Sequence, residues 1–160
     1  MSEPAFDRLL AGLATAEIRF VLVGGLALGS WGVIRGTKDV DVVADPDPEN
    51  LRRLAALAVE LSGQVETGEA FLSSEPSIAV ALTSGDRVYI ETALGPLDVV
   101  QGLAGVPSYT ELRSRAKRTD VLGTEVWICS LDHLRAMKRA AGRTRDLADL
   151  EDLDTAHGAD

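Results

Sequence analysis

The chain has 160 residues, of which 46% are hydrophobic and 26% charged, and its net charge at pH 7 is −9. This length allows one substantial core and leaves no room for a second large one, so we expect a single domain over residues 1–160. The acidic balance argues against a broad nucleic-acid-binding surface, and no apolar run approaches the roughly 18 residues that a membrane span needs. The N-terminus lacks the pattern of a secretory signal, so the expected location is cytoplasmic.

Basic residues are unevenly distributed, which allows a local basic face on an acidic protein. They form two clusters in the second half of the chain: Arg113, Arg115, Lys117 and Arg118, then Arg135, Lys138, Arg139, Arg143 and Arg145. Either cluster could bind a triphosphate or RNA, although helix surfaces often carry such charges only for solvation.

The first half of the chain predicts helices that alternate with two strands. Apolar residues at helical spacing predict a helix over residues 4–16. The apolar run at 18–23 predicts a buried strand that ends at the pair Gly24-Gly25. A short helix at 26–32, a strand at 38–44 and a helix at 49–61 follow. Asp47 is the expected N-cap of that last helix and Pro48 its first residue.

The second half predicts a β-rich middle and a helical end. The expected strands are 78–82, 87–92 and 97–100, with turns at 84–86 and 94–96. A helix at 109–117, a strand at 125–129, a helix from the Ser130 cap to about 141 and a helix at 145–153 complete the chain. The expected fold class is α/β (α+β), a mixed sheet flanked by helices.

The most informative motif is Asp39-Val-Asp41, two carboxylates two residues apart in an apolar run. Side chains at positions i and i+2 of a strand project from the same face, so both carboxylates point to one spot while Val40 and Val42 enter the core. Like charges held this close need a cation between them, and carboxylate oxygens select a hard ion such as Mg²⁺. The motif therefore indicates phosphate chemistry.

The pair Gly24-Gly25 precedes this strand and has two possible purposes. Because glycine has no side chain, the backbone there can approach a phosphate closely and offer N–H donors. The alternative is a plain tight turn.

The order of these motifs resembles the nucleotidyltransferase superfamily that is built on the DNA polymerase β-like core. Its pattern is an apolar strand, a Gly-Gly or Gly-Ser turn, a short helix, an Asp-x-Asp strand and a third carboxylate on a later strand. The matching positions are Val23-Gly24-Gly25, Asp39-Val-Asp41 and Asp98. Residues 35–41, 90–98, 132–138 and 142–146 look like the small bacterial branch that includes AbiEii-type toxins. The similarity covers most of residues 18–153, the expected core of one nucleotidyltransferase domain.

The resemblance implies roles for the acidic residues. Asp39 and Asp41 would bind two Mg²⁺ ions, one of which holds the triphosphate of an NTP substrate. Asp98 would complete the second metal site and help to deprotonate the attacking hydroxyl. The alternative for Asp98 is an acid at a strand end that is satisfied by a turn.

The resemblance also implies contacts with the nucleotide. Lys138 would lie near the triphosphate together with Arg143 and Asp146, unless it only forms an ion pair between helices. Three residues that precede the acidic strand are further candidates for phosphate binding, or for pairing with surface acids: Arg35, Thr37 and Lys38. Structural or solvent-exposed roles are expected for Trp31, Cys129, His133 and His157, the last in a frayed tail.

Three functions fit this sequence. The leading one is an Mg²⁺-dependent enzyme that transfers a nucleoside monophosphate to tRNA, as the toxin of a toxin–antitoxin pair with a cognate antitoxin protein. The second keeps the chemistry but uses a protein or a small molecule such as an aminoglycoside as acceptor, which the acidic charge favours. The third is a non-catalytic nucleotide-binding or antitoxin-like module.

Overall fold

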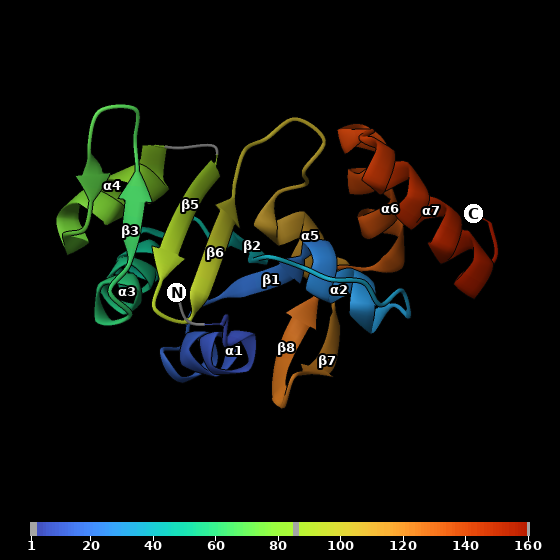
Figure 1. Cartoon of the computed structure of the whole chain (residues 1–160), viewed down its shortest axis with the longest axis horizontal. Helices are drawn as coiled ribbons and strands as arrows, with labels where there is room; N and C mark the ends of the chain where they lie inside the picture. Colours follow the sequence, from blue (N-terminus) through green and yellow to red (C-terminus); the bar gives the residue numbers. More distant parts are fainter. Residues whose placement is uncertain (1–2, 85–86, 160) are drawn as a thin grey trace.

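The computed structural model describes residues 3–84 and 87–159, and its centre is one mixed sheet of eight strands (Figure 1). The helices and strands follow in chain order: α1 (Phe6–Thr15), β1 (Phe20–Val23), α2 (Gly24–Ser30), β2 (Val40–Ala44), α3 (Pro48–Glu60), β3 (Gln64–Glu66), β4 (Phe71–Leu72), α4 (Glu75–Ser84), β5 (Arg87–Thr92), β6 (Gly95–Val100), α5 (Tyr109–Arg115), β7 (Lys117–Val121), β8 (Thr124–Ile128), α6 (Leu131–Ala141) and α7 (Thr144–His157). This mixed α/β architecture confirms the predicted fold class.

The strand order places the acidic strand in the middle of the sheet. The order is β4-β3-β5-β6-β2-β1-β8-β7. Strand β2 runs antiparallel to β1 and parallel to β6, and β1 runs parallel to β8. As predicted, Val40 and Val42 of β2 are fully buried. Central strands with buried neighbours hold their register firmly, so side chains on β2 and β6 have fixed relative positions.

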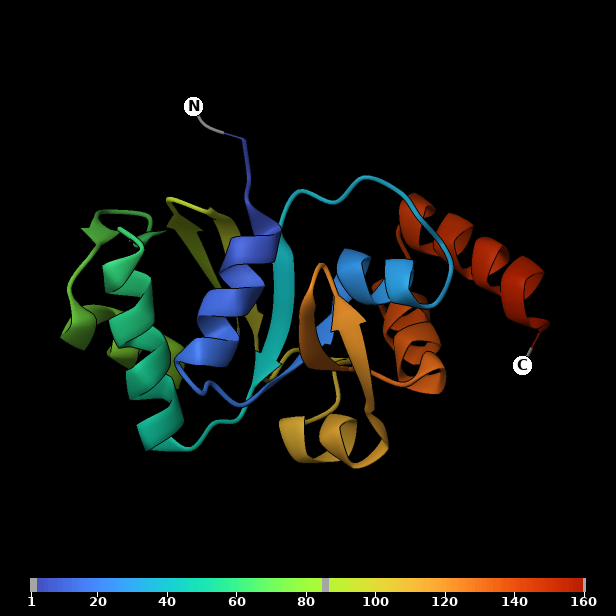
Figure 2. The ribbon, with the colours of Figure 1, turned by 90° about the horizontal axis from the view of Figure 1, so that it is seen from below.

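One face of the β3–β5–β6 half of the sheet is covered by helices. Figure 1 and Figure 2 both show α3 and α4 on the same side of these strands. Along β5, Val88 and Ile90 are buried towards this side, whereas Arg87, Tyr89 and Glu91 are exposed on the other. The opposite face of β5 and β6 is therefore the one on which polar side chains gather.

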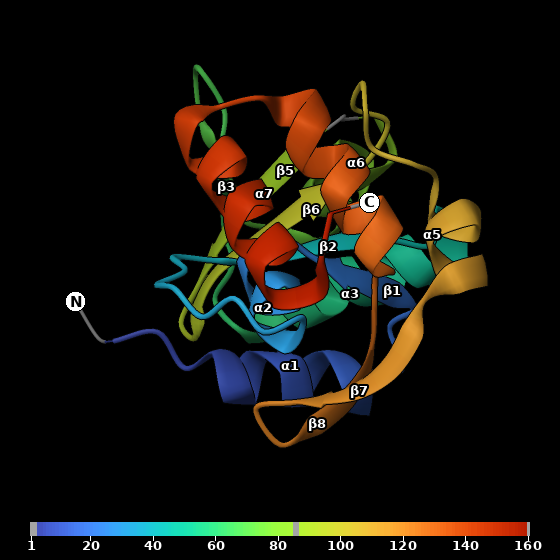
Figure 3. The same ribbon diagram turned by 90° about the vertical axis from the view of Figure 1, so that its right-hand side faces the viewer.

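The C-terminal helices lie together at the other end of the molecule. Helices α6 and α7 pack against each other, and α6 also contacts α2 (Figure 3). The predicted caps are confirmed: Asp47 accepts a hydrogen bond from the Asn50 N–H at the start of α3, and Ser130 accepts one from the His133 N–H at the start of α6. Gly142 ends α6 with a φ of 64°, a left-handed conformation that favours glycine.

The strand predicted at 78–82 is wrong, because these residues lie within α4. A short apolar run cannot be assigned to helix or strand by periodicity alone. Here Ile78 and Leu82, four positions apart, are the residues of α4 that are buried, which is the spacing of one helix face. Of the turn predicted at 84–86, Ser84 is the last residue of α4, and residues 85 and 86 lie outside the described residues.

The prediction missed three short strands, β3, β4 and β7, and several boundaries differ. The short helix predicted at 26–32 is α2 at Gly24–Ser30, and Gly95 and Pro96 of the turn predicted at 94–96 begin β6. Helix α5 ends at Arg115, and the predicted last residue of that helix, Lys117, begins β7. Helix α7 extends to His157, so the expected frayed tail is wrong at this residue. Its ring meets Trp31 edge to face, with 5.8 Å between ring centroids. Within the described residues, no helix is long and apolar enough to cross a membrane.

Candidate active site

Three carboxylates converge where β2 and β6 lie side by side. Asp41 in β2 pairs directly with Asp98 in β6, and Asp39 immediately precedes β2. Each of the three offers one oxygen, and these oxygens all lie within 4.8 Å of one another. The structure thus brings together the three acids that the motifs single out. A cluster of carboxylate oxygens fits Mg²⁺ by its donor chemistry.

Without a cation, the carboxylates of this cluster repel one another. Burial of the Asp41 carboxyl group, reinforced by the negative charges of Asp39 and Asp98, raises the pKa of Asp41 to about 8. Asp98 is only 3% exposed. Groups that are buried next to like charges favour their neutral form, and a divalent cation reverses this preference.

The glycine pair is required by the packing around the acids. Gly24 begins α2 with a φ of 69°, and a Cβ atom there would lie 2.1 Å from Oδ2 of Asp41. A Cβ atom on Gly25 would lie 2.6 Å from Oγ1 of Thr37. The Thr37 hydroxyl in turn donates a hydrogen bond of 3.1 Å to the carbonyl of Asp39. Only glycine lets the turn, the loop and the acidic strand approach this closely.

The sequence analysis missed Arg87, which binds the third carboxylate. Its Nε lies 3.0 Å from both Oδ1 and Oδ2 of Asp98, and its Nη2 lies 2.7 Å from Oδ2. Arg87 is the first residue of β5, the neighbour of β6, and it stands on the same sheet face as Asp98. No local signal distinguishes this arginine, because its partner lies on another strand.

An ion network connects the loop before β2 with the C-terminal helices. Nζ of Lys138 lies 2.9 Å from Asp149 and 3.4 Å from Asp146. Arg35 binds Asp149 through Nε at 2.8 Å and Nη2 at 3.0 Å, and Arg143 binds Asp146 through Nε at 2.7 Å. Lys138, Asp146 and Asp149 are buried.

These contacts give several predicted residues partners within the protein. Lys138 forms the ion pair between helices that the sequence analysis gives as its alternative, and Arg35 pairs with an acid, Asp149, that the sequence analysis missed. Burial raises the pKa of Asp149, but hydrogen bonds from Arg35 and Lys138 outweigh burial and lower it. Contacts of these residues with a triphosphate stay a prediction. Lys38 is exposed.

The residues that were expected to pack do so. Nε1 of Trp31 donates a hydrogen bond of 2.9 Å to the carbonyl of Cys129. Cys129 is fully buried, and burial raises the pKa of its thiol to about 12. His133 is buried beside Glu111. None of these three residues belongs to the group of acids at β2 and β6.

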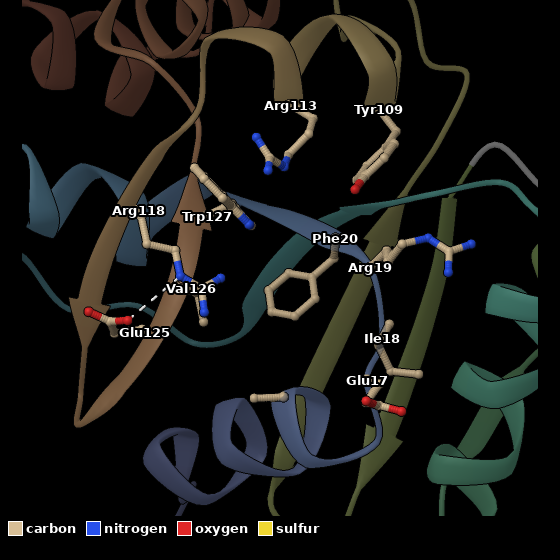
Figure 4. Close-up of a pocket in the computed structure, with 11 residues that line it drawn as sticks. Glu17, Ile18, Arg19, Phe20, Tyr109, Arg113, Arg118, Glu125, Val126 and Trp127 are labelled. Carbon is tan, nitrogen blue, oxygen red and sulfur yellow. Dashed lines mark ion pairs between the residues drawn. The ribbon is translucent and has the colours of Figure 1, made fainter.

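A separate cavity of about 390 Å³ is lined by residues of α5, β7 and β8, of the end of α1, and of the segment that leads into β1 (Figure 4). Arg113 and Tyr109 reach into it from α5, and the guanidinium carbon of Arg113 lies 3.4 Å from the ring centroid of Trp127. None of the three clustered acids lines this cavity. Part of the first basic cluster therefore lies outside the candidate active site.

Comparisons with known proteins bear on the fold of the chain. No protein-family model and no curated protein matches the sequence. Among solved structures, the lincosamide antibiotic adenylyltransferase LnuA with bound lincomycin is similar with a TM-score of 0.67 and 12% identity, over 98% of each chain. The antibiotic-resistance factor ANT(2'')-Ia has a TM-score of 0.62 and 15% identity, over 95% of this chain and 82% of that one.

A third similar structure is a candidate nucleotidyltransferase from Thermotoga maritima, with a TM-score of 0.57 and 13% identity, over 92% of this chain and 88% of that one. At such low identity the likeness shows the fold alone. The chain has the nucleotidyltransferase fold, with three clustered acids at the centre of its sheet.

Proposed function

We propose that the protein is an Mg²⁺-dependent nucleotidyltransferase that moves a nucleoside monophosphate from an NTP to an acceptor hydroxyl. The observation that supports this most strongly is the convergence of Asp39, Asp41 and Asp98, with oxygens within 4.8 Å of one another. Such a cluster is unfavourable as a purely structural feature, because three carboxylates in a partly buried site repel each other.

The three acids would have different roles in metal binding and proton transfer. Asp39 and Asp41 would supply the oxygens that hold two magnesium ions, and Asp98 would complete the second site. When bound, these ions neutralise charge on the triphosphate and activate the attacking oxygen. Asp98 would help to take the proton from the acceptor hydroxyl. The products are a nucleotidylated acceptor and pyrophosphate.

Other residues of the site would position the nucleotide. Gly24 and Gly25 allow the backbone to approach the phosphates, and Arg143 supplies a positive charge on a side chain that is 64% exposed. Lys38 is exposed next to Asp39.

Four further residues would act indirectly. Arg35 and Lys138 already bind Asp149, and Asp146 binds Arg143, so these contacts hold the loop before β2 and helix α7 in place. Thr37 keeps the loop against Gly25.

For the acceptor we favour a small molecule with a hydroxyl group. The protein has a net charge of −9, which suits a cationic acceptor such as an aminoglycoside. Tyr89 pairs with Asp98 across β5 and β6, and both Tyr89 and Glu91 are exposed on the face that carries the acids. LnuA is a lincosamide adenylyltransferase, and ANT(2'')-Ia is known in complex with adenylyl-tobramycin.

The second candidate acceptor is tRNA, with the protein as a toxin that a cognate antitoxin restrains. The basic residues Arg113 and Arg118 beside Trp127 favour it, since arginine and aromatic side chains together bind single-stranded nucleic acid.

The test is transfer of label from each α-labelled NTP in the presence of Mg²⁺. Acceptors are a panel of aminoglycosides and lincosamides, total tRNA and whole-cell protein. Asp41→Ala is the inactive comparison, and Arg118→Ala tests the tRNA surface. We expect label on a small molecule that depends on Asp41.

Label on tRNA that is lost in Arg118→Ala would move the assignment to the toxin-like transferase, and label on protein would identify a protein-modifying enzyme. Nucleotide binding without transfer to any acceptor would contradict the enzymatic assignment and indicate a binding module.

A further inference from the structure

Arg87 and Asp98 form a two-pronged ion pair at the candidate active site. Three donor–acceptor distances of 2.7–3.0 Å connect the guanidinium group with both oxygens of the carboxylate. Bidentate arginine–carboxylate pairs are short and geometrically specific. Both carboxylate oxygens of Asp98 therefore have a positively charged partner.

The two partners differ greatly in solvent exposure. The side chain of Arg87 is 55% exposed, whereas that of Asp98 is 4% exposed. Arginine has a long side chain that can leave an exposed ion pair at modest cost. The carboxylate of Asp98 is held by its position in a central strand, so any rearrangement at this pair moves Arg87.

Within residues 3–84 and 87–159, Arg87 is the cation that forms an ion pair with one of the three clustered acids, Asp98. The nearby cations Arg35, Lys138 and Arg143 have other carboxylate partners, Asp149 and Asp146. The hydrogen bond to Asp98 is the largest cause that raises the pKa of Arg87. The negative charges of Asp98, Asp41 and Asp39 raise this pKa further. Arg87 is thus the counter-ion of the whole cluster.

A divalent ion held by Asp98 and the guanidinium group of Arg87 would compete for one carboxylate. Two positive groups in contact with the same oxygens repel each other. We propose that Arg87 is an exchangeable counter-ion of the metal site, which is displaced from Asp98 when the divalent ion binds and then binds the triphosphate. This proposal rests on the proposed function, because it assumes that the acids hold a metal.

A purely structural role for Arg87 makes the opposite prediction. If Arg87 only orients Asp98, its removal lets the carboxylate turn away and weakens metal binding. If Arg87 competes with the metal, its removal strengthens binding of the metal alone. The sign of the change in metal affinity therefore separates the two roles without any measurement of activity.

The experiment measures binding of Mn²⁺, in the absence of nucleotide, to wild type, Arg87→Ala and Arg87→Gln by electron paramagnetic resonance. We expect roughly tenfold tighter Mn²⁺ binding in Arg87→Ala, since a hydrogen-bonded charge pair no longer has to be broken. Binding of a non-hydrolysable NTP with Mg²⁺ should become roughly tenfold weaker in the same variant, because the triphosphate loses a cation.

Arg52→Ala is the matched control. The Arg52 side chain is 60% exposed and pairs with Glu49 on α3, so this variant removes the same charge from a surface pair outside the acidic cluster and outside the candidate tRNA surface. It should change neither affinity more than about twofold, apart from the weak long-range effect of one surface charge. A melting curve of each variant confirms folding, and Arg87→Gln supplies the test if Arg87→Ala unfolds.

Three results have distinct meanings. Tighter Mn²⁺ and weaker NTP binding in the Arg87 variants support the exchange. Unchanged or weaker Mn²⁺ binding in these variants, with normal binding in wild type, overturns it and leaves the proposed function intact. Absence of Mn²⁺ binding in wild type and in every variant contradicts the metal site itself, and with it the proposed function.

Discussion

Asp41 and Asp98 are directly paired residues on the neighbouring parallel strands β2 and β6. Their side chains therefore leave the sheet on the same face, and Asp39 joins them from the residue before β2. This pairing explains why the acids come together although Asp98 is far from the other two in the sequence. It also concentrates negative charge, so the stability of the protein and its affinity for a metal ion both depend on pH.

The raised pKa of Asp41 predicts a pH-dependent loss of stability in the absence of metal. Its pKa of about 8 in the folded protein lies above the value in an unfolded chain, so folding binds the proton more tightly. The stabilisation is complete at low pH and disappears as the pH rises through about 8.

In EDTA, the melting temperature of wild type should therefore fall relative to that of Asp41→Asn between about pH 5 and pH 8, by roughly 10 °C. Saturating Mg²⁺ should restore wild type at high pH and should not affect Asp41→Asn. A constant difference in melting temperature between the two proteins across this pH range would contradict a raised pKa of Asp41.

Gly24→Ala should abolish metal binding. The new Cβ atom would meet Oδ2 of Asp41 at 2.1 Å, and the φ of 69° costs an alanine about 1–2 kcal/mol. Gly29→Ala is the control in the same helix, because nothing lies within 4 Å of its Cβ position. That variant should bind Mn²⁺ normally and melt at the same or a slightly higher temperature. Equal Mn²⁺ affinity in the two variants would show that the Gly24–Asp41 contact does not matter for the site.

Lys138→Met should destabilise the protein by about 3 kcal/mol, because it leaves Asp146 and Asp149 buried with less positive charge. Lys138 is 7% exposed and contacts both carboxylates. Chemical denaturation measures the loss of unfolding free energy. Lys38→Met removes the same charge from an exposed position and should change the stability by less than about 0.5 kcal/mol. If Lys138→Met instead leaves stability unchanged and weakens NTP binding, direct contact with the triphosphate is the better assignment.

Asn50→Ala should destabilise the protein by about 3 kcal/mol. The Asn50 side chain is fully buried and accepts a hydrogen bond of 2.8 Å from the N–H of Arg19. It also donates to the carbonyls of Arg19 and Asp45, at 3.0 and 2.9 Å. The variant removes the Asn50 partner of the Arg19 N–H and of the Asp45 carbonyl where β1 begins and β2 ends, whereas the Arg19 carbonyl still accepts a hydrogen bond of 3.0 Å from the Asp45 N–H. Urea denaturation should show the loss, whereas Arg52→Ala on the exposed side of α3 should remain close to wild type.

Local sequence determined the features that depend on neighbours along the chain. The apolar runs fixed β1 and β2 because a buried strand needs continuous apolar side chains. Asp47, Ser130 and Gly142 fixed helix ends because caps act on backbone groups within the same turn. The two-residue spacing of Asp39 and Asp41 placed both carboxylates together, since side chains alternate along a strand.

Tertiary structure decided the rest, because the relevant partners are distant in sequence. Residues 78–82 are equally compatible with a strand and a helix, and packing of Ile78 and Leu82 on one face selected the helix. Strand β7 is largely polar and forms through pairing with β8. The partners Arg87 for Asp98 and Asp149 for Lys138 also come from separate elements. The sequence therefore identified the acids of the site, and only the packed sheet and helices determined which cations neutralise them.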